Sequence, residues 1–309
     1  MRKSRDSHDK SEKSVYITPA PPVDIGKSLS GFHKMAKDTV RLHPRREKVI
    51  RSLSRIGGAF LWPKNEEWPT CTEHDCAYVG IIQLFKDDAP ELEFPKNSDL
   101  FQLLLCPNVH SASSSPDAQV IWRHTSQSEN QIDIPFVPAK MQKQYYPLLC
   151  SIHPEQVVEY KDGGELSQDD LAAVEKSKAI SDAVIDPGIP AIENWDVPQS
   201  NVDMYFSWLS VAPGIKLGGH PRWIQDPFYP KCQRKHTMEL LVSFATVEFD
   251  GLTWGRWLPV SDRSILSASY TERENVQTPT GCTFGGSGTL YIFICRQCED
   301  WPIHSFMQS

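Results

Sequence analysis

Short apolar segments separated by turn residues recur along most of the chain and predict a mainly β protein of the α+β class. Segments rich in β-branched and aromatic residues suit the half-buried surface of a sheet. The 24 prolines and 17 glycines argue against a helical bundle, because an interior proline removes a helix hydrogen bond. The expected strands are residues 78–85, 100–106, 119–123, 204–211, 238–247 and 289–295.

Two other segments have the spacing of amphipathic helices. Between residues 28 and 42, apolar side chains recur three or four positions apart, and Ser28 is a possible helix cap. Between residues 167 and 184, Ser167 and Asp170 have the spacing of a capping box. We therefore expect peripheral helices at both places.

Residues 55–71 align without a gap onto residues 216–232, which predicts an internal duplication of two related β lobes. A glycine pair allows positive φ or close backbone approach, and a tryptophan supplies a large apolar contact. The alternative is that these residues are turns and core anchors without a direct functional role. The identical pairs are Gly57 with Gly218, Gly58 with Gly219, Trp62 with Trp223, Pro69 with Pro230 and Cys71 with Cys232.

These patterns divide the chain into four parts. Residues 1–24 are polar and proline-rich, and they are expected to form a mobile arm. Residues 25–160 would hold an N-terminal helix and the first β lobe, and residues 161–200 a helical connector. Residues 201–309 would form the second β lobe.

Four side chains in the second copy predict a structural zinc site. Cys232 and His236 precede one expected strand, and Cys295 and Cys298 follow another. Two such pairs on neighbouring strand ends can converge on one tetrahedral Zn2+. Four protein ligands leave no position for an activated water, so the expected role is structural. The alternative is two unlinked features, buried thiols and a surface histidine.

The first copy contains a weaker second set of possible ligands. The sequence leaves open whether His74 or Cys76 would be a ligand beside Cys71. Pro107 restricts how the chain turns between Cys106 and His110. A degenerate copy without metal is equally compatible with the sequence. The candidate ligands are Cys71, His74, Cys76, Cys106 and His110.

Other local patterns do not define a catalytic motif. Cys150 and His153 are close in sequence, but a nucleophile and its base must be assembled in space, so a buried or incidental pair is favoured. Trp254 and Trp257 could line a pocket with Arg256 stacked on an aromatic face. Core packing is the favoured role for these aromatic residues.

The charge balance bears on the kind of partner. Lys and Arg total 32 against 39 Asp and Glu, a formal net charge of −7, which disfavours nucleic-acid binding and suits a basic protein partner. No apolar run approaches the ~18 residues of a membrane span, and the polar N-terminus does not resemble a signal peptide. We therefore expect a cytoplasmic protein with reduced cysteines.

Residues 211–225, together with the Ile-Gly-Gly and Trp-Pro signals of the first copy and residues 81–84, resemble the YwqG-like family of mostly bacterial proteins. This resemblance implies a duplicated, mainly β fold with peripheral helices and brings no established reaction. The C-terminal half, through residues 217–223, 238–242 and 290–298, resembles the N-terminal region of programmed cell death protein 2, a eukaryotic ribosomal-protein chaperone. Relatives often place Cys or His pairs at the two ligand positions, although His236 departs from a Cys-x-x-Cys first pair.

The favoured function from sequence is a non-enzymatic protein-binding module, chaperone-like or adaptor, with structural Zn2+ in its C-terminal lobe. A toxin-neutralising, immunity-type protein is one alternative and would use the same acidic surface. The other alternative is an enzyme whose active site lies between the lobes and is assembled from residues that no local motif reveals.

Overall fold

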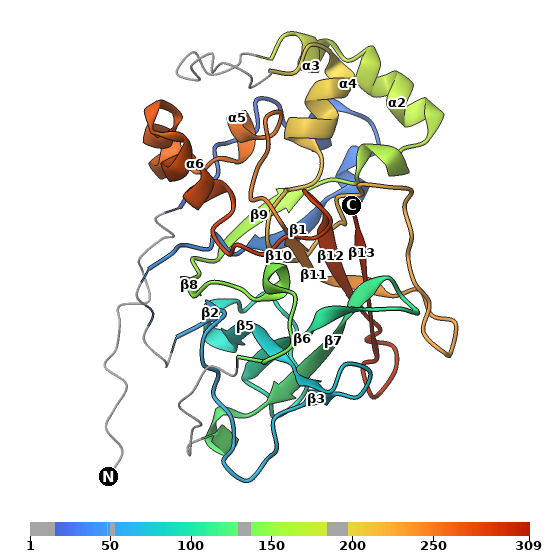
Figure 1. The fold of residues 1–309 in the computed structure, drawn as a ribbon. Coiled ribbons are helices and arrows are strands. Elements are labelled where there is room, and N and C mark those ends of the chain that lie inside the picture. Colours follow the sequence, from blue (N-terminus) through green and yellow to red (C-terminus); the bar gives the residue numbers. More distant parts are fainter. Residues whose placement is uncertain (1–15, 48, 50–52, 129–136, 184–196) are drawn as a thin grey trace.

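The computed structural model describes residues 16–47, 49, 53–128, 137–183 and 197–309, and antiparallel sheets dominate it (Figure 1). The six-stranded sheet has the order β13-β12-β11-β10-β1-β9, and the five-stranded sheet has the order β7-β6-β5-β2-β8. The mainly β fold class is therefore confirmed. The six-stranded sheet contains β1 (Lys37–Arg41), β9 (Glu155–Glu159), β10 (Lys216–Gly218), β11 (Glu239–Ala245), β12 (Thr289–Ile294) and β13 (Ile303–Gln308). The five-stranded sheet contains β2 (Arg55–Ile56), β5 (Val79–Phe85), β6 (Leu100–His110), β7 (Ser115–Arg123) and β8 (Cys150–Ser151), and a hairpin joins β3 (Thr70–Cys71) to β4 (Cys76–Ala77).

The two sheets share one hydrophobic core between their facing sides. On β12, Leu290 and Ile292 belong to this core, whereas the alternate residues Tyr291 and Phe293 pack on the opposite face. This is the two-residue period of a strand whose faces are both covered. Leu105 and Cys106 of β6 divide in the same way between the core and the opposite face of the five-stranded sheet. Each sheet therefore has a second, outer cluster of buried side chains.

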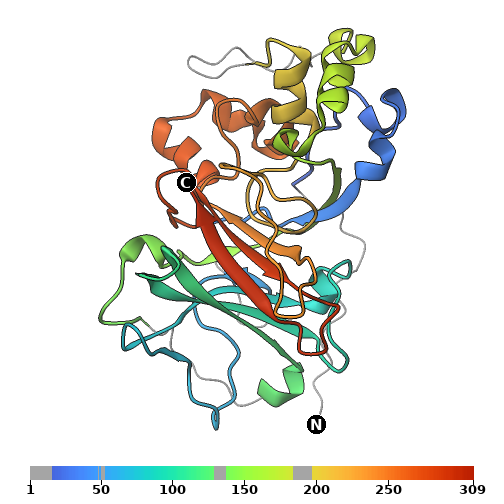
Figure 2. The ribbon, with the colours of Figure 1, turned by 90° about the vertical axis from the view of Figure 1, so that its right-hand side faces the viewer.

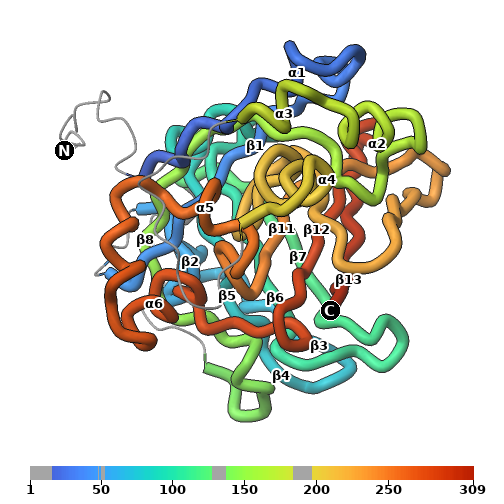
Figure 3. Tube along the Cα trace, turned by 90° about the horizontal axis from the view of Figure 1, so that it is seen from above, coloured from blue at the N-terminus to red at the C-terminus, as the bar shows by residue number. Residues whose placement is uncertain are grey.

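Short helices gather above the six-stranded sheet, and Figures 2 and 3 show them from the side and from above. Buried side chains from α1, α2, α3 and α4 form a cluster of their own. None of the described helices is both long and apolar enough to cross a bilayer. The α-helices are α1 (Ile25–Ser28), α2 (Gln168–Glu175), α3 (Lys178–Ser181), α4 (Asn201–Met204), α5 (Trp254–Trp257) and α6 (Tyr270–Gln277), and Tyr205–Leu209 is a π-helical turn. The 3-10 turns are η1 (Phe32–Met35), η2 (Lys86–Asp88), η3 (Thr125–Ser128), η4 (Lys143–Tyr145), η5 (Gly163–Glu165) and η7 (Val260–Ser267).

The predicted helix at residues 167–184 is present in two pieces. Ser167 and Asp170 form the expected capping box at the start of α2. The helix breaks at Ser177, whose side chain accepts a hydrogen bond from the Ile180 amide and so caps α3. Residues after 183 in this prediction lie outside the described residues.

The predicted helix at residues 28–42 is wrong. Only α1 and the short turn η1 lie there, and Gly31 between them has φ of 85°. The remainder is β1, which pairs with β9 on one side and with β10 on the other. Thr39 and Val40 are β-branched, and pairing in the middle of a sheet outweighs the helical spacing of the apolar residues.

The predicted strand at residues 204–211 is also wrong, because the segment forms the end of α4 and the π-helical turn. Met204, Tyr205, Trp208 and Leu209 pack into the helical layer at helical spacing, while Phe206 is exposed. The aromatic content of the segment favoured a strand and obscured this period. Observed strands confirm the other five predicted ones, with β6 reaching His110 and β7 beginning at Ser115.

The sheets do not follow the expected division of the chain into lobes. Two strands from residues 25–160, β1 and β9, lie in the six-stranded sheet beside the strands of residues 201–309. Residues 1–15 of the expected mobile arm and residues 184–196 of the expected connector lie outside the described residues. Thr18 is buried, and its amide and hydroxyl both donate hydrogen bonds to Glu155.

Candidate metal centres

The structure brings Cys232, His236, Cys295 and Cys298 together in one group, which we name the second cluster. The Cys298 sulfur lies 3.7 Å from the sulfur of Cys232 and also 3.7 Å from that of Cys295. The His236 Nδ1 atom lies 3.6 Å from the sulfurs of Cys295 and Cys298. A tetrahedral Zn2+ with ordinary bond lengths needs sulfur atoms about 3.8 Å apart and sulfur and nitrogen about 3.5 Å apart. The four donor atoms therefore have the spacing of a zinc coordination shell.

Neighbouring strand ends position the two halves of the second cluster. The Cys232 amide donates a hydrogen bond to the His236 carbonyl at 3.0 Å, which closes a tight turn just before β11. Cys295 follows the last residue of β12, and β12 pairs with β11 so that Ile294 faces Glu239. Both pairs of donors consequently lie at the same end of two adjacent antiparallel strands.

A group of the same size lies beside the five-stranded sheet and contains Cys71, His74, Cys106 and His110, which we name the first cluster. The His74 Nδ1 atom lies 3.5 Å from the Cys71 sulfur and 3.4 Å from the Cys106 sulfur. The His110 Nε2 atom lies 3.4 Å from the Cys71 sulfur. These separations also fit a tetrahedral shell of thiolates and imidazoles.

The structure favours His74 over Cys76 as a ligand in the first cluster. His74 is one of the four grouped donors, whereas the Cys76 sulfur accepts a hydrogen bond from the Asn108 side chain at 3.4 Å. Cys76 faces Cys71 across the β3–β4 hairpin, and its sulfur is not among the four donor atoms that lie within 4.8 Å of one another.

Glu73 is a residue of the first cluster that the sequence patterns did not reveal. Its carboxylate lies 3.0 Å from His110 Nδ1 and also accepts hydrogen bonds from the amide and hydroxyl of Ser111. A carboxylate on one ring nitrogen fixes the tautomer and leaves the other nitrogen, here Nε2, as the donor to a metal. The sequence signal was weak, since a Glu beside a His is common on any surface.

The aligned tryptophans occupy corresponding places beside the two clusters. The ring centroids of Trp62 and Trp68 lie 4.6 Å apart, and both residues pack in the same hydrophobic group as the buried thiols of the first cluster. The ring centroids of Trp223 and Tyr229 lie 5.4 Å apart, and both residues pack against the thiols of the second cluster. Aromatic walls of this kind exclude water from a metal shell and stiffen its ligands.

The glycine pairs have one backbone conformation in both copies. Gly57, Gly58, Gly218 and Gly219 all have φ between 66° and 75°, a region that side chains with a Cβ atom rarely adopt. Space is also restricted, because a Cβ on Gly219 would lie 2.1 Å from a carboxylate oxygen of Glu159. The backbone geometry thus requires glycine at all four positions.

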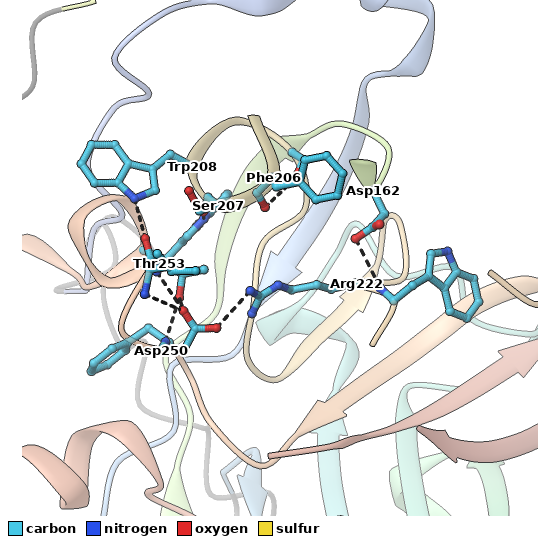
Figure 4. Close-up of polar contacts among 12 residues, drawn as sticks. Asp162, Phe206, Ser207, Trp208, Arg222, Asp250 and Thr253 are labelled. Carbon is cyan, nitrogen blue, oxygen red and sulfur yellow. Dashed lines mark hydrogen bonds and ion pairs between the residues drawn. The ribbon is translucent and has the colours of Figure 1, made fainter. Parts of the chain in front are cut away.

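Hydrogen bonds tie Trp223, in the wall of the second cluster, to η5, and Figure 4 shows Asp162, which accepts one of them. The Trp223 amide donates to Asp162 at 3.3 Å, and its ring nitrogen donates to Glu165 at 2.9 Å. Burial raises the pKa of Asp162, although the amides of Gly164 and Trp223 oppose this rise. The neighbouring Arg222 forms an ion pair with Asp250 at 3.0 Å, which Figure 4 also shows.

All eight cysteines lie among the described residues, and each is a buried free thiol. The Cys150 sulfur donates to the Pro279 carbonyl, while the ring of His153 faces Ser151 at 3.1 Å. Burial raises the pKa of Cys150 to about 12, so its thiol is protonated near neutral pH. This pair has neither the contact nor the thiolate that nucleophilic catalysis needs.

Comparison with known families gives one match. A family model described as "Domain of unknown function (DUF1963)" matches residues 54–257. The matched region includes both glycine pairs and the whole first cluster, and it ends before Cys295 and Cys298 of the second cluster. No curated protein matches this chain.

Proposed function

Because this chain belongs to the DUF1963 family, whose description names no activity, we propose from its own chemistry that it is a non-enzymatic protein-binding module with two structural zinc ions. The observation that carries this proposal is the pair of four-donor clusters with tetrahedral spacing. Four protein donors fill the shell of Zn2+, so the metal would serve as a scaffold. Structural zinc binds with about 10–16 kcal/mol, which is comparable to the total stability of a typical domain.

We also infer that the two sheets arose by internal duplication. The order β7-β6-β5-β2 in one sheet corresponds to β13-β12-β11-β10 in the other. Each copy places its glycine pair at the end of the shortest of these strands and its donors beside the next two. A duplicated unit with one metal per copy accounts for both correspondences.

The surface that best suits a protein partner is a groove of about 680 Å³ beside the second cluster. Phe228 is 52% exposed and packs against His304, which lines this groove. Glu299 and Asp300 line it together with Lys231 and Arg234, so the groove itself carries both signs of charge. The preference for a basic protein segment rests on the net charge of −7 of the whole chain. The groove is lined by Lys231, Cys232, Gln233, Arg234, Met238, Cys298, Glu299, Asp300, Pro302, Ile303 and His304.

Zinc in the second cluster would hold the walls of this groove in place. Cys232 and Cys298 both line the groove and would share one metal ion. A chaperone-like or adaptor role follows, in which a rigid surface with charged and apolar side chains holds a basic segment of another protein.

Affinity purification from the native cells tests this proposal. Tagged full-length protein should retain a protein partner in stoichiometric amount, and Phe228→Ser should reduce its recovery by ~10-fold, as loss of an apolar interface anchor does. Tyr270→Ser is the matched control, because Tyr270 is 73% exposed on α6. Absence of a stoichiometric partner, or equal recovery with Phe228→Ser, would reject the proposed role of this groove.

A further inference from the structure

Three buried arginines lie where β1 and the segment after it meet α5, and we name them the arginine cluster: Arg41, Arg45 and Arg256. Each of the three residues is at most 8% exposed to solvent. Arg41 is the last residue of β1, and Arg256 lies in α5. A hydrogen bond of 3.0 Å from Arg41 Nη1 to the Trp257 carbonyl joins the two elements.

Arg41 and Arg256 approach the same aromatic ring. The guanidinium carbon of Arg256 lies 4.3 Å from the Trp257 ring centroid, and that of Arg41 lies 5.5 Å from it. Burial, and then the positive charge of Arg41, lower the pKa of Arg256 to about 9, so it is still charged at neutral pH. Two like charges are therefore held near each other out of contact with solvent, an arrangement that requires a compensating negative group.

Most of the donor capacity of this cluster is unused. Arg41 Nε and Nη2, Arg256 Nε and Nη1, and Arg45 Nε are buried and have no hydrogen-bond partner within the described part of the chain. Guanidinium nitrogens only donate, so acceptor oxygens alone can satisfy them. Buried polar groups are normally paired, and five such nitrogens on three neighbouring arginines mark a place where an acceptor binds.

The neighbouring carboxylates act on the cluster, but among the described residues their hydrogen bonds and ion pairs go to groups other than Arg41 and Arg256. Glu155 accepts hydrogen bonds from Thr18 and pairs with His43 at 2.9 Å. Asp262 pairs with Arg45 Nη2. Within the described ranges, no carboxylate forms an ion pair with Arg41 or Arg256.

Glu248 completes the charged surroundings of the cluster. Its carboxylate accepts a hydrogen bond from the Ile215 amide, and its charge acts on both Arg41 and Arg45 without an ion-pair contact. Burial raises the pKa of Glu248 to about 7, so this group compensates only part of the positive charge at neutral pH.

We propose that the arginine cluster is a binding site for a small oxyanion, a carboxylate or phosphoryl group, held between the guanidinium groups of Arg41 and Arg256. The planar fork of arginine matches two oxygens of such a group, and the unpaired nitrogens of both residues supply the donors. Trp257 adds a flat apolar surface beside the anion. This inference goes beyond the protein-binding role and does not depend on it.

Two partly exposed segments of the chain meet close to Arg41. The Val260 amide donates to the Ile17 carbonyl at 2.9 Å, and both residues are about half exposed. Thr18, next to Ile17, accepts a hydrogen bond of 2.7 Å from Arg41 Nη1. We expect a ligand to enter when the segment at residues 16–18, which also contacts Arg41, Arg45 and Glu155, separates from the chain after α5.

Titration calorimetry on the full-length protein tests the proposal, with inorganic phosphate and acetate as separate probes at constant ionic strength. We expect saturable binding of one of them, and the responding probe distinguishes a phosphoryl from a carboxylate ligand. Arg256→Gln should weaken this binding by ~10-fold or more, the loss of one charge-assisted contact. Arg273→Gln on α6 is the matched control and should bind as the unmodified chain does.

A second readout does not require a variant to fold. Protein labelled with 15N at arginine should show shifts of the buried Nε–H resonances of Arg41 and Arg256 as phosphate or acetate is added. Failure of both probes to bind saturably, with these resonances unchanged, would overturn the proposal. Equal binding by folded Arg256→Gln and the unmodified chain would overturn it as well.

Discussion

The ammonium nitrogen of Lys216 lies 2.7 Å from each carboxylate oxygen of Glu159, and both side chains are fully buried. The same carboxylate accepts hydrogen bonds from the Ala212 and His220 amides, and Lys216 also donates to the His220 carbonyl. This ion pair joins β9 to β10, the two strands on either side of the helical segment at residues 161–200. It therefore fixes how the chain returns to the sheet at β10.

Removal of one member of this pair should be costly. Lys216→Met leaves Glu159 buried without its cation, and we expect the free energy of unfolding to fall by about 3–5 kcal/mol. The double variant Lys216→Met with Glu159→Gln should recover part of this loss, because no unpaired charge is left. Urea denaturation of the three proteins measures both values, and losses that simply add in the double variant would contradict the coupling.

Zinc analysis checks the membership of both clusters. The purified chain should contain two zinc ions, and Cys298→Ser should lose one and melt at a lower temperature, because its cluster keeps only three strong donors. Cys106→Ser should lose the other. Cys76→Ser is the control, since Cys76 bonds to Asn108 outside the first cluster. A normal zinc content in Cys298→Ser, or a loss in Cys76→Ser, would show that the ligands are assigned wrongly.

The Glu73 carboxylate, which contacts His110 Nδ1, should raise the affinity of the first cluster for zinc. Glu73→Gln removes the charged partner of His110 Nδ1, and we expect the affinity for zinc at this cluster to fall by ~10–100-fold. Competition with a chelator measures the affinity. Glu67→Gln, at an exposed position nearby, is the matched control. Equal zinc retention by the two variants would mean that Glu73 does not orient the ligand.

Local chemistry was sufficient where a feature depends on neighbours in sequence. Ser167 and Asp170 lie three residues apart, so their capping box is visible in the sequence and present in the structure. The alternation of core and outer residues on β12 likewise needs only one strand. Cys232 and Cys295 lie far apart, and the position of each donor pair at the end of an expected strand was what suggested that they meet.

Features set by long-range contacts were missed. The segment at residues 28–42 has helical spacing, yet strand partners that lie more than a hundred residues away decide its conformation. Separation in sequence also hides the pairing of Lys216 with Glu159, 57 residues apart, and the approach of Arg41 and Arg256 to one tryptophan ring. Charged residues have no period that marks them as buried, so only the folded chain brings such groups together.

His220 should make stability depend on pH in a defined direction. Burial lowers its pKa to about 3 in the folded chain, while its side chain contacts the Met35 carbonyl at 2.8 Å. Below pH ~6.5 the unfolded chain binds a proton that the folded chain does not, so stability is lost as the pH falls from ~6.5 toward ~3. The slope for this one group is about 1.4 kcal/mol per pH unit.

The variant His220→Gln isolates this effect, because glutamine keeps a donor for Met35 and does not titrate. The free energy of unfolding of the unmodified chain, minus that of the variant, should decrease by about 2–3 kcal/mol between pH 7 and pH 4.5. His43, whose pKa is also lowered to about 3 by burial, is present in both proteins and cancels, as does any loss of zinc in acid. Denaturation curves at several pH values give the difference, and parallel pH profiles would exclude His220 as the source.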